Sequence, residues 1–190
     1  MAQIKYLKDT ASNTKFYPVT HTNAVVGINK YSEKQPVFID LGLSVKWATC
    51  NIGANSPEEY GDYFAWGEVE PKNEYSWSTY KLCNGSSSSL TKYTSSDGKT
   101  KLESVDDVVV YKYGGDLYLP SLDDWEELKT KCTWTWTTQN GMYGYNVTGP
   151  NGNSIFLPAA GYKYDSSTST ISHGYYWTSE VYNPRTYGHN

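Results

Sequence analysis

An α+β fold of short antiparallel strands with one clear helix is predicted by three features of the sequence. From Val37 onward, short apolar stretches alternate with turn-forming residues, which is typical of strands joined by tight connections. The segment Gly-Pro-Asn-Gly-Asn at residues 149–153 separates two strand-like stretches and indicates a hairpin turn. Residues 121–132 place apolar side chains at helical spacing between start and stop signals.

The expected strands are short and alternate in polarity. They cover residues 37–40, 45–50, 143–148 and 154–157. At the hairpin between the last two, the step from Asn151 to Gly152 supplies the positive φ values that a tight turn requires. Residues 84–96, which include four consecutive serines, are predicted to form a surface loop.

The helix expected at residues 121–132 has Ser121 as its N-cap, acidic residues in its first turn and lysines in its last. One face carries Trp125, Leu128 and Cys132, so we expect this face to dock on the sheet. A second, shorter helix is expected to begin at Ser56, because proline and two glutamates follow a serine that can cap it.

Residues 1–37 form a segment distinct from the domain predicted for residues 38–190. Strand-like stretches near residues 4–7, 16–19 and 24–28 are separated by polar turns. Isolated hairpins are marginal in water, so these strands need partners from the main domain or from other subunits. We therefore predict that residues 1–37 serve in attachment or oligomerisation.

Composition argues against several functional classes. The 190 residues include 16 basic and 20 acidic side chains, a net charge of −4 without any basic tract, so we expect no nucleic-acid partner. No apolar run approaches the roughly 20 residues of a membrane helix, so we expect no membrane span. Residues 1–8 are polar and charged where an export signal has an apolar core, and no export signal is expected.

Catalytic and metal-binding patterns are also lacking in the sequence. The three cysteines form no C-x-x-C pair and are best explained as buried apolar residues, although a bridge between Cys83 and Cys132 stays open. The three histidines are far apart, and the acidic pairs are sequence neighbours that cannot face each other across a cleft. We therefore expect no catalytic residue, no metal site and no cofactor.

Residues 116–128, D-L-Y-L-P-S-L-D-D-W-E-E-L, resemble the R-L-P-T-x-x-E-W-E signature of C-type-lectin-fold proteins in the sulfatase-modifying-factor branch. Residues 40–54, 60–68, 132–136 and 157–162 look like a repeated domain of gut Bacteroidetes and their phages. The resemblance covers about residues 38–179. It implies a C-type-lectin-like scaffold of the kind that displays variable surfaces diversified by a diversity-generating retroelement. The E-P-N and W-N-D motifs of calcium-dependent lectins are missing, which implies no calcium in the binding site.

The N-terminal segment has a second resemblance. Residues 3–9 and 15–21 look like the opening of virion structural proteins from phages of the same bacteria. This implies that residues 1–37 bind other virion proteins and that the protein, made in the host cytoplasm, belongs to the phage particle. Relatives continue past the Tyr-Tyr-Trp-x-Ser element at residues 175–179 through further strands. We therefore expect the domain to be C-terminally incomplete, or else completed by another chain.

The segment 174–190 is the best candidate for a ligand-binding surface. It mixes Tyr, Asn, Arg, His, Ser and Gly, the residue types that recognition loops favour. Tyr175 and Trp177 could instead alternate inward as core residues of a strand, and for Trp177 we expect this inward position. The candidate ligand-binding residues are Tyr175, Tyr182, Asn183, Arg185, Tyr187, His189 and Asn190.

The expected function is that of a non-enzymatic virion adhesin, a tail or fibre receptor-binding protein whose tyrosine-rich surface binds a protein or glycan on the host cell. We expect a symmetric homo-oligomer, with a trimer favoured. Several weak binding sites on one particle would then give a high effective affinity through avidity. Two alternatives stay open. One is a structural head-fibre or capsid-decoration protein, and the other is a bacterial surface protein that binds glycans.

Overall fold

The computed structural model describes residues 7–8, 15–16, 35–169 and 173–181. The chain divides into two units, Met1–Ser32 and Glu33–Asn190. In the first unit, β1 (Leu7–Lys8) pairs antiparallel with β2 (Lys15–Phe16). The strand-like stretches predicted near residues 4–7 and 16–19 are thus partly confirmed as a hairpin. The third predicted stretch, residues 24–28, lies outside the described residues.

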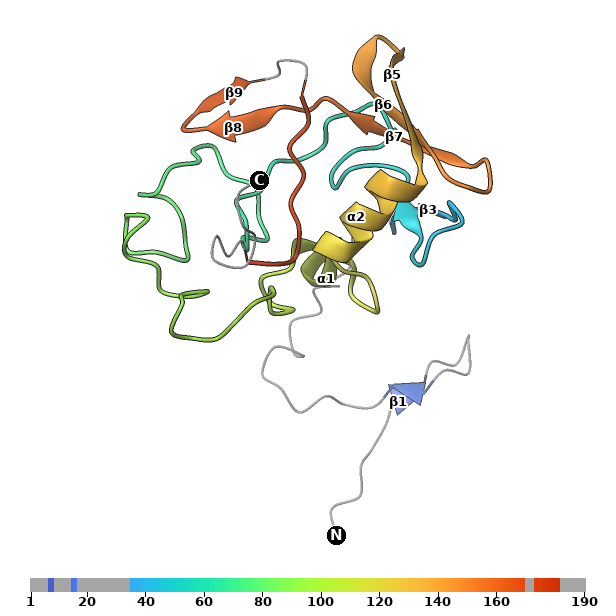
Figure 1. Ribbon diagram of the computed structural model, residues 1–190. Coiled ribbons are helices and arrows are strands. Elements are labelled where there is room, and N and C mark those ends of the chain that lie inside the picture. The colour runs from blue at the N-terminus through green and yellow to red at the C-terminus, as the bar shows by residue number, and fades with distance from the viewer. Residues whose placement is uncertain (1–6, 9–14, 17–34, 170–172, 182–190) are drawn as a thin grey trace. The chain divides into compact units, whose positions relative to one another are not determined.

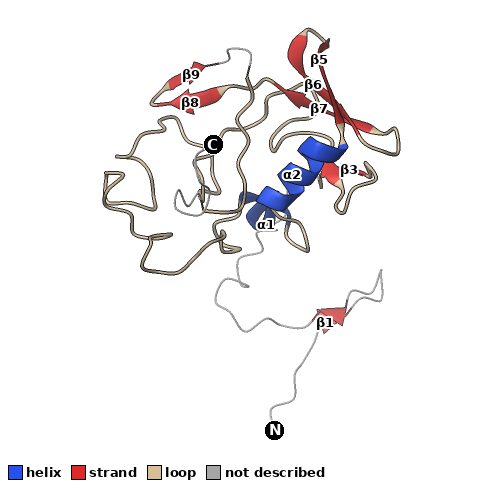
Figure 2. Cartoon of the chain, in the orientation of Figure 1, coloured by secondary structure: helices blue, strands red, loops and turns tan. Residues whose placement is uncertain are grey.

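The described residues of the second unit form two helices and small antiparallel sheets, the α+β arrangement that the sequence predicts (Figures 1 and 2). Its elements are β3 (Phe38–Ile39), β4 (Trp47–Ala48), α1 (Val108–Tyr113), α2 (Leu122–Lys131), β5 (Thr133–Gln139), β6 (Met142–Thr148), β7 (Ser154–Pro158), β8 (Tyr162–Tyr164) and β9 (Ser167–Ser169). Long loops occupy much of the remainder, as Figure 2 shows in tan. Neither helix of the described residues has the length and apolar character needed to cross a membrane.

The largest sheet has the strand order β5-β6-β7, and all of its pairs are antiparallel. The predicted hairpin is confirmed, since β6 and β7 flank residues 149–153. Of the predicted Asn-Gly step, Gly152 has a positive φ of 87°, whereas Asn151 does not have a positive φ. Strand β5 was not among the expected strands. Its Thr and Trp residues favour a pleated surface, and pairing with β6 along its full length realises that preference.

Helix α2 is confirmed with its predicted cap. The Ser121 hydroxyl accepts a hydrogen bond from the Asp124 amide, and the Asp124 carboxylate accepts one from the Ser121 amide, which completes a capping box. The predicted docking face is confirmed as well, because Leu128 is fully buried and both Trp125 and Cys132 pack against the core.

The second helix was predicted at the wrong place. Residues 56–59 form only a turn, closed by a 3.2 Å hydrogen bond from the Glu59 amide to the Ser56 carbonyl. The short helix is α1, whose three consecutive valines have a poor intrinsic preference for helix. The buried carboxylate of Asp107 accepts hydrogen bonds from two amides of its first turn and from the Leu119 amide, so the cap and tertiary contacts outweigh that preference.

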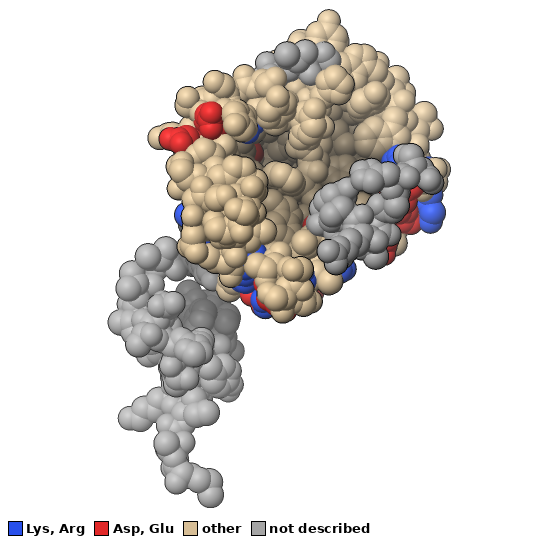
Figure 3. All heavy atoms as spheres, turned by 60° about the vertical axis from the view of Figure 1, so that its left-hand side comes forward, with Lys and Arg blue, Asp and Glu red and all other residues tan. Residues whose placement is uncertain are grey.

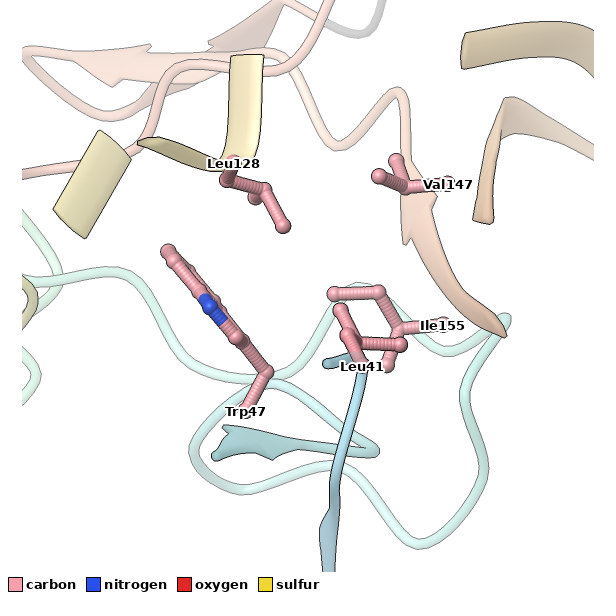
Figure 4. Packing of buried hydrophobic residues seen from close by; sticks show 5 residues of the cluster. All are labelled: Leu41, Trp47, Leu128, Val147 and Ile155. Atoms are coloured by element: carbon pink, nitrogen blue, oxygen red, sulfur yellow. The ribbon is translucent and has the colours of Figure 1, made fainter. Parts of the chain in front are cut away.

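The main core lies where α2, the β5–β7 sheet and the β3–β4 hairpin meet. The side chains of five buried residues point toward one another there (Figure 4): Leu41, Trp47, Leu128, Val147 and Ile155. The Trp47 and Trp125 rings meet edge to face, with centroids 4.9 Å apart. Each element contributes only one or two of these side chains, so the core depends on all of them being assembled.

The cysteines take no part in a disulfide bridge. Cys50, Cys83 and Cys132 are all free. The Cys83 thiol donates to the Trp77 carbonyl at 3.2 Å, while burial beside the core raises the pKa of the Cys132 thiol. The bridge between Cys83 and Cys132 that the sequence left open is therefore not formed.

Candidate functional site

Residues 173–181 cross the second unit as an extended segment, drawn in red in Figure 1, between the loop region and α2. Tryptophan indoles fix it on both sides. The Trp66 indole donates to the Thr178 carbonyl at 2.8 Å, the Trp177 indole donates to the Phe64 carbonyl at 2.8 Å, and the Trp125 indole donates to the Trp177 carbonyl at 3.2 Å. The segment is therefore held by loop 60–66 and by α2 together.

The side chains of residues 175–177 alternate between the surface and the interior, as those of an extended backbone do. Tyr176 points inward, where its hydroxyl donates to the Pro158 carbonyl at 2.7 Å and burial raises its pKa to about 12. Tyr175 and Trp177 lie on the outside, 65% and 51% exposed. The prediction of an inward Trp177 was wrong, and so was the inward alternative for Tyr175.

Gly174 explains why Tyr176 can take the inward position. A Cβ at residue 174 would lie 2.7 Å from the Tyr176 ring and 2.9 Å from the Pro158 carbonyl oxygen. Glycine is thus the residue that lets the segment approach β7 this closely. This close contact sets which side chains of the segment point inward, and it therefore leaves Tyr175 exposed.

Tyr175 lies beside the β8–β9 hairpin. Its ring meets the Tyr162 ring edge to face, with centroids 5.2 Å apart, and the Gly161 amide donates to the His173 carbonyl at 2.7 Å. We call the exposed side chains of Tyr162, Tyr164, Tyr175 and Trp177 the tyrosine patch. Within the described part of the chain, none of its three phenol hydroxyls has a hydrogen-bond partner.

A shallow pocket of about 250 Å³ lies within this patch. It is lined by Gly161, Tyr162, Ser169, His173 and Tyr175. A volume of this size is below the roughly 300–1,000 Å³ of pockets that enclose a small molecule. The pocket therefore suits one protruding group of a larger ligand better than a whole small ligand.

The described lining of this pocket contains no Lys, Arg, Asp or Glu side chain. Figure 3 shows one side of the second unit as a hollowed surface with few such charged side chains except toward its edges. The lysine of β8, Lys163, lies over the rings of Tyr63 and Tyr75, at 5.1 and 5.7 Å from their centroids. Recognition here would depend on apolar contact and hydrogen bonds rather than on ion pairs.

Of the candidate residues named from the sequence, only Tyr175 is among the described residues, and its side chain is exposed. The others lie outside the described residues: Tyr182, Asn183, Arg185, Tyr187, His189 and Asn190. Sequence reasoning missed Tyr162 and Tyr164. Their alternation around Lys163 in a short strand places both rings on one face, and this pattern was the available signal.

Several acidic side chains of the described residues make structural contacts. Asp106 accepts a hydrogen bond from the Tyr93 hydroxyl at 2.6 Å and pairs with Lys92. Glu58 accepts hydrogen bonds from the amides of Gln139 and Asn140 at 3.2 and 2.6 Å. In residues 35–169 and 173–181, no group of three or more His, Cys, Asp or Glu side chains could hold a metal ion.

Glu68 is a buried carboxylate that sequence reasoning did not single out. It is 3% exposed, and its Oε1 atom accepts hydrogen bonds from Lys72 Nζ at 2.9 Å and from the Lys81 amide at 2.8 Å. The charge of Glu68 also adds to the effect of burial, which raises the pKa of Tyr80 to about 12. These contacts tie together residues 68–81, so we assign Glu68 to the structure of the loop region.

Comparisons of the chain with protein-family models, with curated proteins and with solved structures gave no significant match. The candidate site is therefore defined by its geometry. It consists of exposed aromatic rings on and beside a segment whose backbone is fixed from two sides, next to a shallow pocket whose described lining has no Lys, Arg, Asp or Glu.

Proposed function

We propose that the protein is a non-enzymatic receptor-binding protein of a phage particle and that the tyrosine patch contacts the host receptor. One observation supports this most directly. The Trp177 indole is hydrogen-bonded to the Phe64 carbonyl, and the Tyr175 ring is buttressed by Tyr162, yet all three rings stay substantially exposed. Rings that are exposed and already oriented gain little from internal packing and are suited to contact with another molecule.

Preorganisation explains why such a surface can bind. A side chain that is immobilised on binding costs about 0.5–1.5 kcal/mol, and an aromatic ring fixed beforehand avoids much of that cost. Tyrosine combines a large apolar area with a hydroxyl, and few rotatable bonds need to be frozen. The described pocket lining, which has no Lys, Arg, Asp or Glu, favours a receptor bound through stacking and neutral hydrogen bonds, either a protein or a glycan.

The wider assignment follows from the resemblance in the sequence. We propose a C-type-lectin-like scaffold in the second unit, with variable positions that continue from Tyr175 into residues 182–190. We further propose that residues 1–37, which include the β1–β2 hairpin, attach the protein to other virion proteins. A homotrimeric mount would then multiply weak individual contacts through avidity.

The test uses purified full-length protein and a panel of gut Bacteroidetes isolates, with bound protein measured by flow cytometry. Tyr175→Ala is expected to lower the apparent affinity by roughly tenfold or more, as loss of a binding hot spot does. Its thermal midpoint should stay within error of the parent because the side chain is 65% exposed. Trp77→Ala, which removes another half-exposed aromatic ring, is the matched control and should bind as the parent does.

A second variant replaces residues 182–190 by an unrelated sequence of equal length and should change which isolates are bound. Binding that ignores both changes would reject the site. Labelling of intact particles with an antibody against the second unit gives an independent check. Label at the tips of tails or tail fibres would support the adhesin, whereas label confined to the capsid surface would favour the structural alternative.

A further inference from the structure

Three aromatic side chains form a row on one face of β5 and β6, separate from the tyrosine patch in sequence. Trp136 lies opposite Tyr145 in the strand register, and Thr138 lies opposite Tyr143. The Trp136 and Tyr143 rings are within 10° of parallel with centroids 6.0 Å apart, and the Tyr145 ring meets Trp136 edge-on at 5.0 Å. We call Trp136, Tyr143 and Tyr145 the sheet ridge.

The sheet ridge is the uncovered end of a face whose other end is buried. Side chains of alternate residues share one face of a strand, so Tyr143, Tyr145 and Val147 all lie on the same side of β6. Val147 is fully buried and belongs to the main core, whereas Tyr143 and Tyr145 are 59% and 39% exposed and Trp136 is 42% exposed. Packing in the main core therefore explains the apolar residue at one end of this face but does not explain the exposed aromatic residues of the ridge.

The polar atoms of the ridge are also unused. The neighbouring Trp134 indole donates to the Leu128 carbonyl at 3.2 Å, as a structural tryptophan does. In contrast, the Trp136 indole N–H and the hydroxyls of Tyr143 and Tyr145 have no hydrogen-bond partner within the described ranges. The ridge thus offers one donor and two groups that can both donate and accept, all at the edges of aromatic rings.

The charge of this region restricts what the ridge can bind. Residues 133–162 contain no Asp, Glu, Lys, Arg or His, so the whole β5–β7 sheet and its turns are formally uncharged. Phosphate-bearing ligands and anionic surfaces are attracted by lysine and arginine, which this sheet lacks. The sheet also has no carboxylate of its own that could pair with a cation, and the Glu58 carboxylate at its β5–β6 turn is hydrogen-bonded to Gln139 and Asn140. A complementary ligand is therefore neutral.

The size of the ridge restricts its partner further. At roughly 150–250 Å² per aromatic side chain, the exposed fractions correspond to about 200–350 Å² of ring surface. A stable protein partner needs about 800 Å² on each side. The ridge alone is too small for that but matches a few units of a chain molecule.

We propose that the sheet ridge binds a neutral polysaccharide. One face of a pyranose ring presents C–H groups that pack on an aromatic ring, while its rim presents hydroxyls that can bond to the free indole and phenol groups. The uncharged sheet and the limited area fit such a chain, bound along the row from Tyr143 to Trp136. This site is additional to the proposed function, since it includes no residue of the tyrosine patch and needs no virion.

The test is electrophoresis of the full chain through native gels that contain mannan, dextran, xylan or β-1,3-glucan, with polygalacturonate as an anionic comparison. At least one neutral polysaccharide should retard the protein. Trp136→Ala and Tyr143→Ala should each raise the apparent dissociation constant about tenfold or more. Tyr143→Phe, which keeps the ring, should cost less. Trp77→Ala is the matched control for an exposed tryptophan and should migrate as the parent does.

Several results would overturn the proposal: no retardation in any neutral gel, retardation only by polygalacturonate, or equal retardation of the parent and both alanine variants. A dimer detected by analytical sedimentation and abolished by Trp136→Ala would do so too, because the ridge would then be a protein interface. Tyr175→Ala keeps the sheet ridge and should retain polysaccharide binding. Binding of Tyr175→Ala to cells tests the adhesin assignment, and migration of Trp136→Ala in the gels tests polysaccharide binding by the sheet ridge. The two proposals can therefore fail independently.

Discussion

The helix-and-sheet region and the loop region of residues 60–107 are held together in different ways. The first buries apolar side chains, with Leu41, Leu128 and Val147 fully enclosed. The second has almost no regular structure, and its backbone is held by polar atoms of large side chains, such as the Tyr80 hydroxyl, which donates to the Trp66 carbonyl at 2.8 Å. A loop region can therefore be well defined without secondary structure when aromatic side chains satisfy its carbonyl groups.

This contrast changes how the 19 tyrosines of the chain should be interpreted. Tyrosine is among the residue types that favour recognition in the segment 174–190. Yet the hydroxyls of several tyrosines donate within the fold: Tyr63, Tyr75, Tyr80, Tyr93 and Tyr176. Candidates for recognition are the exposed rings whose hydroxyls lack a partner in the described residues, which include Tyr175 and Tyr143.

The largest effect is expected in the apolar core. Leu128→Ala should lower the free energy of unfolding by about 3–5 kcal/mol, because it opens a cavity among side chains that cannot collapse around it. Leu90→Ala in the loop region, where the side chain is 39% exposed, should cost less than about 1 kcal/mol. Urea unfolding measures both, and similar losses for the two variants would contradict the division into regions.

The buried ion pair of the loop region should come next. Glu68→Ala should cost about 2–3 kcal/mol, because it leaves Lys72 without its carboxylate and the Lys81 amide without its acceptor. Glu126→Ala removes an exposed carboxylate that pairs with Lys129 on α2 and should cost less than about 0.5 kcal/mol. If the two variants unfold at the same urea concentration, the loop region does not depend on its buried polar contacts.

A smaller loss is expected when one structural hydroxyl is deleted. Tyr80→Phe should cost about 1–2 kcal/mol at neutral pH, since the Trp66 carbonyl loses its donor. Burial raises the pKa of Tyr80 from the ordinary value of 10 to about 12. The neutral phenol therefore contributes its full stabilisation of the fold at pH values below 10. That contribution is lost as pH rises from 10 through about 12. Stability measured across this range should fall less steeply in the variant, and an unchanged slope would argue against a buried phenol.

The smallest effect concerns the surface of α2. Hydrogen bonds from Lys131 and then from Ser44 lower the pKa of Glu127 from 4.5 to about 2. A lowered pKa means that the carboxylate stabilises the fold above pH 4.5 and that this contribution is lost as pH falls through about 2. Glu127→Gln should therefore flatten the acid side of the stability profile, and Lys131→Ala should flatten it in part. A profile identical to the parent in Glu127→Gln would exclude this linkage.

Local chemistry made much of the framework predictable. The cap at Ser121, the face of Leu128 and the turn at Gly152 depend on neighbours within a few residues, and all three were expected from the sequence. Helix α1 was not, because its valines oppose a helix and the buried Asp107 outweighs them through contacts that include Leu119, 12 residues away.

For the candidate site, the sequence determined which residue types are present and that neighbours in an extended segment face opposite ways. It did not determine which neighbour faces inward. Tyr176 lies inside because its hydroxyl reaches the Pro158 carbonyl, 18 residues away, and Trp177 lies outside with its indole on the Phe64 carbonyl, 113 residues away. Such partners become neighbours only when the chain has folded, so the exposure of the tyrosine patch is a property of the tertiary structure.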